Sequence, residues 1–167
     1  MEETFPLVDE SGSVIGSAPR SVCHNGTKLL HPVVHLHVFN KNGGLFLQKR
    51  ADNKDIQPGK WDTSVGGHID YGEDVETALF REAWEELGIS GFTPIFDRKY
   101  IFESSIEKEF VYSYKTVYDG RFSLNPTEIS DGQFWSIEEI KASIGKGVFT
   151  PNFEDEFCKI GISLFYQ

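Results

Sequence analysis

The chain is poor in cysteine and in positive charge, and it has no long hydrophobic run. Only Cys23 and Cys158 could form a disulfide within the 167 residues, and we expect both thiols to be reduced. No apolar stretch approaches the roughly 20 residues that a membrane-spanning helix needs. The acidic start MEETFPLVDE also lacks the basic and apolar regions of a signal peptide. These absences predict a cytoplasmic protein that is not inserted in a membrane.

Acidic residues outnumber basic ones by 26 to 16, which gives a formal net charge of −10 and a sequence pI near 4.9. This balance argues against binding to nucleic acid or to an anionic membrane, because both need a basic surface. A small anionic partner remains compatible with it if cations bridge that molecule to the protein. Ordinary solubility is the alternative reason for the acidic charge.

The length and an apolar content of 39% predict one domain over residues 1–167, with a sizeable core. Neither an internal repeat nor a linker rich in Pro, Gly and Ser divides the chain. Alternating and helical patterns predict a series of strands and helices. The expected strands lie in a hairpin over 5–20 and in segments 31–40, 45–50, 61–69, 93–104, 109–120 and 132–137. The expected helices are 73–87, a short one opened by Ser136 and Glu139, and 152–166. Such a mixture favours an α+β fold in which helices cover a mixed sheet.

The helix predicted over 73–87 carries an unusual concentration of glutamates. At about 100° per residue, one apolar stripe contains Leu79, Phe80, Ala83, Trp84 and Leu87. A second stripe beside it contains Glu82, Glu85 and Glu86. Anions next to a buried face need a cation, and oxygen ligands favour Mg²⁺ or Mn²⁺. Arg81 lies four residues before Glu85 and can brace it. A solvated acidic helix face is the alternative for an arbitrary pattern of this kind.

The segment GHIDYGEDVETALFREAWEELGI, residues 67–89, resembles the Nudix box in every fixed position. Ala83 and Ile89 stand in its aliphatic positions. About ten specified positions at fixed spacing make this a specific signal. The resemblance implies a Nudix α/β/α sandwich with a central mixed β-sheet. It also implies an enzyme that hydrolyses a diphosphate attached to another group.

The same resemblance implies roles for individual residues. Glu82, Glu85 and Glu86 match the ligands of the Mg²⁺ or Mn²⁺ ion, and a carbonyl of the Gly66-Gly67 pair, assigned to Gly67, would complete the metal shell. Glu73 is expected to support Arg81 or a water outside the metal shell. Glu82 is the first candidate for the general base. Glu109 and Glu128 are the alternatives.

A second, narrower resemblance links residues 45–73 to isopentenyl-diphosphate isomerase, an enzyme with the Nudix fold. It implies a possible second metal site, whose ligands would be His24, His31, His68, Glu107 and Glu109. Arg50 and Lys54 match basic residues that grip the diphosphate in that enzyme, and Gly67 and His68 are further candidates for substrate contact. His35 and His37, on an interior strand, are expected to be core histidines.

One departure from the isomerase separates the two chemistries. Gly66 stands where that enzyme has its catalytic cysteine, whereas the hydrolase box is intact. The sequence therefore predicts a hydrolase that cleaves a small organic or nucleoside diphosphate to a monophosphate. An isomerase of isoprenoid diphosphates and a non-catalytic sensor of a nucleotide-linked metabolite are the alternatives, and the complete set of box carboxylates argues against the sensor. The leaving group and the oligomeric state stay open, with a homodimer as one possibility.

Overall fold

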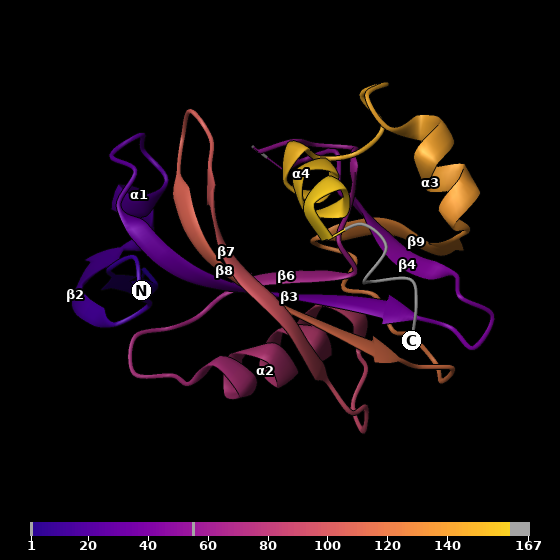
Figure 1. Ribbon diagram of the computed structural model, residues 1–167, viewed down its shortest axis with the longest axis horizontal. Coiled ribbons are helices and arrows are strands. Elements are labelled where there is room, and N and C mark those ends of the chain that lie inside the picture. Colours follow the sequence, from indigo (N-terminus) through magenta and orange to yellow (C-terminus); the bar gives the residue numbers. More distant parts are fainter. Residues whose placement is uncertain (1, 55, 161–167) are drawn as a thin grey trace.

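The computed structural model describes residues 2–54 and 56–160, and these contain nine strands and four helices (Figure 1). The strands are β1 (Thr4–Val8), β2 (Val14–Pro19), β3 (Leu30–Phe39), β4 (Leu45–Arg50), β5 (Trp61–Asp62), β6 (Val65–His68), β7 (Ile95–Glu103), β8 (Lys108–Val117) and β9 (Ile129–Trp135). The helices are α1 (Arg20–Cys23), α2 (Val75–Leu87), α3 (Ile137–Ser143) and α4 (Pro151–Ile160). None of the helices in this described part is long and apolar enough to cross a membrane.

Strand β3 lies at the centre of the seven-stranded sheet. It runs parallel to β8 from Leu30 opposite Lys108 to Phe39 opposite Val117. On its other side it pairs antiparallel with β6, and β7 pairs antiparallel with β8. The path β5-β4-β3-β8-β7 is completed by β6 on β3 and by β9 on β4. Parallel and antiparallel pairs in one sheet confirm the predicted mixed architecture.

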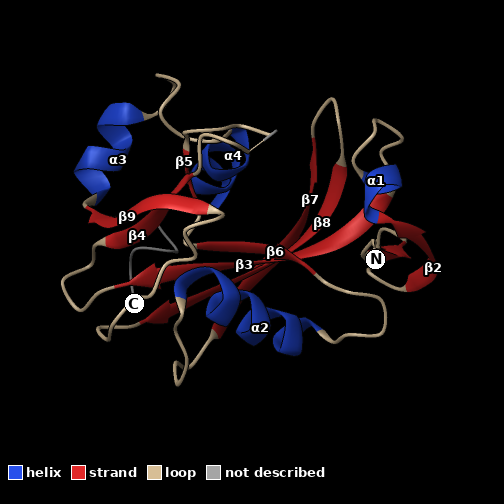
Figure 2. Ribbon diagram, turned by 180° about the vertical axis from the view of Figure 1, so that it is seen from behind, coloured by secondary structure: helices blue, strands red, loops and turns tan. Residues whose placement is uncertain are grey.

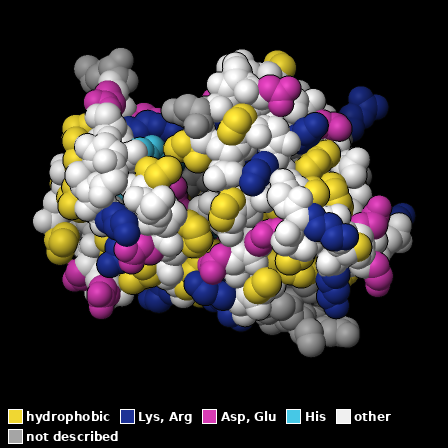
Figure 3. Space-filling view, turned by 90° about the horizontal axis from the view of Figure 1, so that it is seen from above, with side chains coloured by type: hydrophobic (Ala, Val, Ile, Leu, Met, Phe, Trp, Pro, Cys, Tyr) yellow, Lys and Arg dark blue, Asp and Glu magenta, His cyan; other side chains and the backbone are white. Residues whose placement is uncertain are grey.

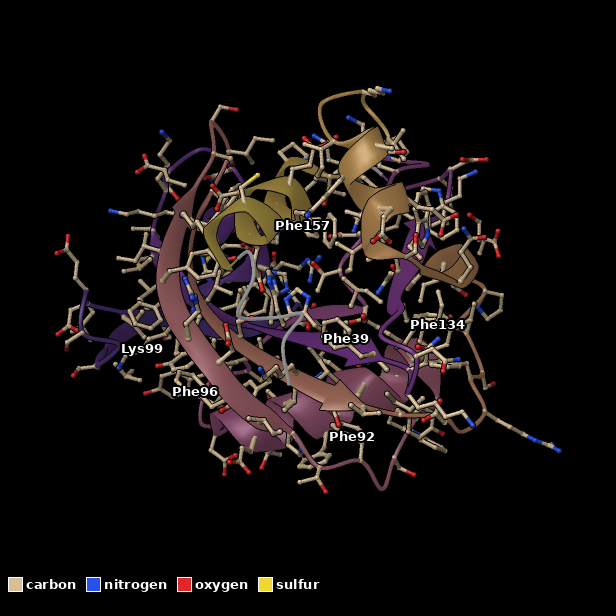
Figure 4. The ribbon with its side chains drawn as sticks, turned by 45° about the vertical axis from the view of Figure 1, so that its right-hand side comes forward. Phe39, Phe92, Phe96, Lys99, Phe134 and Phe157 are labelled. Carbon is tan, nitrogen blue, oxygen red and sulfur yellow. The ribbon has the colours of Figure 1, made fainter. Side chains whose placement is uncertain are left out.

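The alternating side chains of β3 build two separate cores. Val34, Leu36 and Val38 are buried on one face, together with residues of α2. Phe39 faces the opposite side and belongs to a cluster with Phe157 of α4. Figure 1 shows α2 on one side of the sheet and α3 and α4 on the other, and Figure 4 shows Phe39 and Phe157 on the same side. The predicted α/β/α sandwich and the predicted division of β3 into two faces are therefore confirmed.

The hairpin predicted between β3 and β4 is much shorter than the sequence pattern indicated. The two strands pair only at Phe39 and Leu45. Beyond this point β4 pairs with β9 and β5, and Figure 2 shows β4 and β9 diverging from β3 and β6. The cavity described below is lined by residues from β3, β4, β5 and β6, so this divergence makes room for it.

Helix α2 begins two residues later than predicted. Asp74 caps its first turn by accepting a hydrogen bond of 2.7 Å from the backbone of Thr77, and Glu73 lies outside the helix. Gly88 ends it in the left-handed conformation at φ +65°, as its position predicted. The wide apolar stripe was wrong at two positions, because Phe80 is 39% and Trp84 is 62% exposed.

Most of the remaining sequence predictions are confirmed. Strands β1 and β2 form the N-terminal hairpin, and Ser136 with Glu139 forms the capping box of α3. Helix α4 follows the prediction up to Ile160, and the predicted continuation over 161–166 lies outside the described residues. Both cysteines are free, with Cys23 buried and Cys158 exposed.

Candidate active site

Arg81, in the middle of α2, organises the carboxylates of this helix and of the loop before it. Its guanidinium donates two hydrogen bonds of 2.8 Å to Glu73, one of 2.7 Å to Glu82 and one of 3.3 Å to Glu85. It also donates to the backbone carbonyl of His68 at 3.0 Å, which ties the helix to β6. The hydrogen bond from Arg81 lowers the pKa of Glu73. Arg81 thus braces Glu85, as the sequence predicted, and Glu73 supports Arg81.

Glu82 and Glu86 form a half-buried pair of acids, and the only ion pair that either makes with a basic residue of the described chain is that of Glu82 with Arg81. They share a hydrogen bond. Burial raises the pKa of both, and that of Glu86, which is also next to Glu82, lies well above its usual range. Gln48 donates to Glu86 at 2.6 Å, but an amide supplies no charge. Two acids held this way fit a divalent cation, whose charge would allow both to ionise.

Gly67 lets the backbone of β6 approach Glu82 closely. A Cβ atom at this position would lie 2.2 Å from Cδ of Glu82, far inside van der Waals contact. A Cβ atom at Gly66 would lie 3.5 Å from Cδ2 of His35, which is an ordinary van der Waals contact. A side chain at 67 would therefore displace Glu82, whereas one at 66 would make only an ordinary contact, and this close approach fits a backbone carbonyl next to the carboxylates.

A second group of metal-binding side chains lies where β3 and β6 meet α1 and the β7–β8 loop. One ligand atom from each of His24, His31, His68 and Glu107 lies within 4.8 Å of every other. Nε2 of His24 is 3.1 Å from Nε2 of His68 and 3.1 Å from Oε2 of Glu107. Phe5 stacks on His68 at a ring-centroid distance of 4.4 Å. Glu109, the fifth predicted ligand, is not part of this group.

Two histidines of this group, His31 and His68, are in the neutral state that binds metal. Burial lowers the pKa of His31 and lowers that of His68 strongly, so both rings are neutral. Nδ1 of His31 lies 2.8 Å from the carbonyl of Leu29, and a carbonyl only accepts, so this nitrogen carries the proton. Nε2 of His31 is then a buried lone pair that finds no hydrogen-bond partner within the described part of the chain. Three imidazoles and a carboxylate with one orphaned nitrogen fit a transition-metal ion.

Both groups open into one cavity of about 370 Å³. It is lined by ten of the residues expected from the sequence, namely His24, Arg50, Lys54, Gly67, His68, Glu82, Glu85, Glu86, Glu107 and Glu109. Arg81 and His31 lie behind its wall. Figure 3 shows a histidine (cyan) recessed among basic and acidic side chains.

The two predicted diphosphate contacts, Arg50 and Lys54, line this cavity from β4 and the loop that follows it. Nε of Arg50 donates to the carbonyl of Ile56 at 2.9 Å, and Nη1 lies 3.6 Å from Asp62. Lys54 forms an ion pair with Glu128. Both cations are thus held at the wall by neighbouring groups, in position to meet an anion.

Several polar residues of the cavity were missed by sequence reasoning. Gln48, Asp62, Thr150 and Asn152 line it, and Thr150 donates to Asp62 at 2.9 Å. None belongs to a recognisable motif. Glu156 of α4 also escaped notice, although it shares a helix face with Phe153 and Phe157, and an acid within an apolar stripe indicates a buried partner.

The family model of the NUDIX domain matches residues 29–153. A Listeria monocytogenes protein named as an uncharacterized Nudix hydrolase is 36% identical, and the match covers 90% of each chain. A protein of Photorhabdus laumondii named isopentenyl-diphosphate Delta-isomerase 2 is 33% identical over 100% of this chain and 95% of its own. The crystal structure of DR0079 from Deinococcus radiodurans superposes with a TM-score of 0.83 at 26% identity, covering 99% of this chain and 100% of that one.

A braced set of box carboxylates on a Nudix-type sandwich defines a pyrophosphohydrolase enzyme. The chain belongs to the Nudix family, and its relatives carry the names of both hydrolases and isomerases. Enzymes of this family act on small molecules and generally need a divalent metal. The family model ends short of both termini, so a single domain over 1–167 stays a prediction.

Proposed function

We propose that this protein is a metal-dependent hydrolase that cleaves a small organic or nucleoside diphosphate and releases a monophosphate. The observation that carries this proposal is the half-buried pair of acids, Glu82 and Glu86, held between Arg81 and Gln48 against the backbone of Gly67. Arg81 forms an ion pair with Glu82, and no basic residue of the described chain forms one with Glu86, so the pair favours a bound divalent ion. Glu85, which also bonds Arg81, is the third proposed ligand.

The metal would be Mg²⁺ or Mn²⁺, held by Glu82, Glu85, Glu86 and the carbonyl of Gly67. When bound, it would neutralise charge on the diphosphate oxygens and help to deprotonate the attacking water. Arg50 and Lys54, which line the same cavity, bind the diphosphate. Glu82 is the first candidate for the base that accepts the proton of the water.

Glu109 and Glu128 remain the alternative bases. Burial raises the pKa of Glu109 to about 8, which suits a group that exchanges a proton near neutral pH. Glu128 is already paired with Lys54, and this argues for a supporting role.

An isomerase of isoprenoid diphosphates is the second candidate, and the group of His24, His31, His68 and Glu107 favours it. The chain is also 33% identical to a protein named as such an isomerase. Isomerisation transfers protons at carbon, so it needs an acidic and a basic group of the protein in contact with the substrate. The thiol that would supply one of them is replaced by Gly66, and Cys23 is not among the residues lining the cavity. Hydrolysis is therefore the better supported reaction.

The four-residue group is proposed as a second metal site in either case. Its three imidazoles favour a transition ion over Mg²⁺. Metal content after purification and dialysis tests this directly. His31→Ala should lower the amount of transition metal that the protein retains, whereas His37→Gln, which changes a buried histidine outside the group, should not.

A panel of diphosphates tests the proposed reaction. The protein is incubated with nucleoside, sugar and isoprenoid diphosphates in Mg²⁺ or Mn²⁺, and the release of phosphate or monophosphate is measured. Glu86→Gln should lower turnover by at least about a hundredfold, the scale of losing a strong electrostatic contribution. Glu76→Gln, an exposed acid of the same helix, is the matched control and should retain full activity. Full activity in Glu86→Gln, or conversion of isopentenyl diphosphate to dimethylallyl diphosphate without hydrolysis, would contradict the proposal.

A further inference from the structure

A buried carboxylate connects α4 to the sheet underneath the cavity. Glu156 is fully buried, and four side chains from three strands bond to it. Its Oε1 lies 2.5 Å from Nδ1 of His35 and accepts from the hydroxyl of Tyr100 at 2.6 Å. Its Oε2 accepts from Ser113 at 2.6 Å and bonds Nε2 of His37. A buried anion with this many partners is stable only if at least one histidine carries positive charge.

The two histidines of this cluster differ in what lies on their far side. His37 is completely enclosed. The side chain of His35 keeps 9% exposure and lines the cavity. Its ring lies beside Gly66, where a Cβ atom would be 3.7 Å from Nε2. No hydrogen-bond partner for this Nε2 is found in residues 2–54 and 56–160, and the ring borders the cavity where the substrate would lie.

We propose that His35 is a catalytic residue of this enzyme, which donates its Nε2–H to a phosphate oxygen of the bound diphosphate, and that Glu156 is the residue that positions it. This inference rests on the proposed hydrolysis of a diphosphate. A carboxylate that accepts from Nδ1–H fixes the ring orientation and stabilises the doubly protonated ring, in which Nε2 also carries a proton. The absence of a side chain at Gly66 leaves the donor uncovered.

The charges around His35 support a cationic ring. Burial opposes the charged form, but Glu156, followed by Glu109 on β8 and Asp62 on β5, outweighs burial and raises the pKa of His35 to about 9. His37 and the hydroxyl of Tyr100 also bond the carboxylate of Glu156. His68, which is neutral, lies on β6, the strand that pairs with β3 next to His35. The cavity is rich in acids, and Arg50 and Lys54 are both engaged by acids. A further cation in the cavity wall therefore adds to the attraction for an anion.

Two matched variants separate a contact with substrate from a structural role. His35→Asn keeps an amide donor close to the position of Nδ1, so the bond to Glu156 can persist while the cavity donor is lost. His37→Gln does the same for the other histidine, whose Nε2 bonds Glu156 and which does not line the cavity. Thermal unfolding of both variants first measures what each change does to the fold.

The probe is methylenediphosphonate, a diphosphate analogue that cannot be hydrolysed, titrated calorimetrically into the protein in Mg²⁺. We expect His35→Asn to weaken its binding by about tenfold to a hundredfold, the range for a charge-assisted hydrogen bond, and His37→Gln to leave it unchanged. Unchanged binding in His35→Asn, or equal weakening in both variants, would overturn the proposal. Turnover of an active substrate should fall in His35→Asn alone. If the wild-type protein hydrolyses nothing but His35→Asn still binds the probe more weakly, the proposed hydrolysis fails and the contact of His35 stands.

The pH profile tests the role of Glu156. In Glu156→Gln the anion that holds the proton on His35 is gone, so the alkaline limit of analogue binding should move to lower pH. A merely structural change would lower binding without moving that limit. An unmoved limit in a folded Glu156→Gln protein would remove Glu156 from the proposal.

Discussion

A single methyl group at position 67 should disable the metal site. The Cβ of Gly67→Ala would lie 2.2 Å from Cδ and 2.3 Å from Cγ of Glu82. Ordinary van der Waals contact begins near 3.4 Å, so Glu82 must retreat by at least about 1.2 Å. This displacement moves the carboxylate that accepts the 2.7 Å hydrogen bond from Arg81. A displacement of about 1 Å in a catalytic group can cost about a hundredfold in rate, and we expect a loss of that size.

The matched control is the neighbouring glycine. Gly66→Ala adds the same methyl group, but its nearest contact is Cδ2 of His35 at 3.5 Å. Neither glycine has a positive φ, so the alanine backbone is unstrained at both positions. Calorimetric titration with Mn²⁺ should show affinity weakened by about tenfold to a hundredfold in Gly67→Ala and unchanged in Gly66→Ala. Equal Mn²⁺ affinity in the two variants, with both folded, would refute the assignment of Glu82 as a metal ligand.

Three further predictions concern other parts of the cavity. Glu86→Gln removes an acid whose pKa is raised well above its usual range by burial and by Glu82, so the Tm of the metal-free protein should rise near neutral pH. Added Mg²⁺ should stabilise the wild type but not the variant, and an equal Mg²⁺ effect on both would exclude Glu86 as a ligand. Arg50→Ala should raise KM for the hydrolysed diphosphate more than it lowers kcat, because a contact made before the transition state is lost, and an unchanged KM would exclude that contact. The pair of His35 and Glu156 should add stability that is fully present below pH 6.5. It should be lost as the pH rises through about 9, because the pKa of His35 is raised to about 9 in the folded protein. The free energy of unfolding in urea, measured between these pH values, should show the loss in the wild type and not in His35→Asn.

The elements and the box could be predicted from sequence because their signals are local. Fixed spacing identified Gly67, Arg81 and the glutamates, and a glycine at 88 marked the end of α2. Alternation in β3 separated the valine face from the histidine face before any partner was known. These patterns repeat the geometry of one helix or one strand, and no tertiary contact is needed to interpret them.

Contacts between distant segments were beyond such patterns. Gln48 and Glu86 are 38 residues apart, and nothing near either residue indicates their hydrogen bond. His35 and Glu156 are 121 residues apart, so the sequence allowed only the general expectation of a core histidine. That expectation holds for His37 and is incomplete for His35, which also lines the cavity.

The sequence also did not predict which side chains at the edge of a helix face are exposed. Helix periodicity placed Phe80 and Trp84 on the apolar stripe, yet both are exposed because the sheet covers only the narrower face of Leu79, Ala83 and Leu87. A helical wheel shows which side chains share a face but not how much of that face a sheet covers.

Solvent oxygen tests the central claim most directly. The protein is incubated in water enriched in oxygen-18 with Mg²⁺ and either a nucleoside diphosphate or isopentenyl diphosphate, and the products are followed by phosphorus NMR. Hydrolysis by attack of water on phosphorus predicts a phosphate product that carries the heavy isotope, formed by the wild type and by Glu76→Gln but not by Glu86→Gln. An intact diphosphate with a rearranged carbon chain and no isotope at phosphorus would contradict the account.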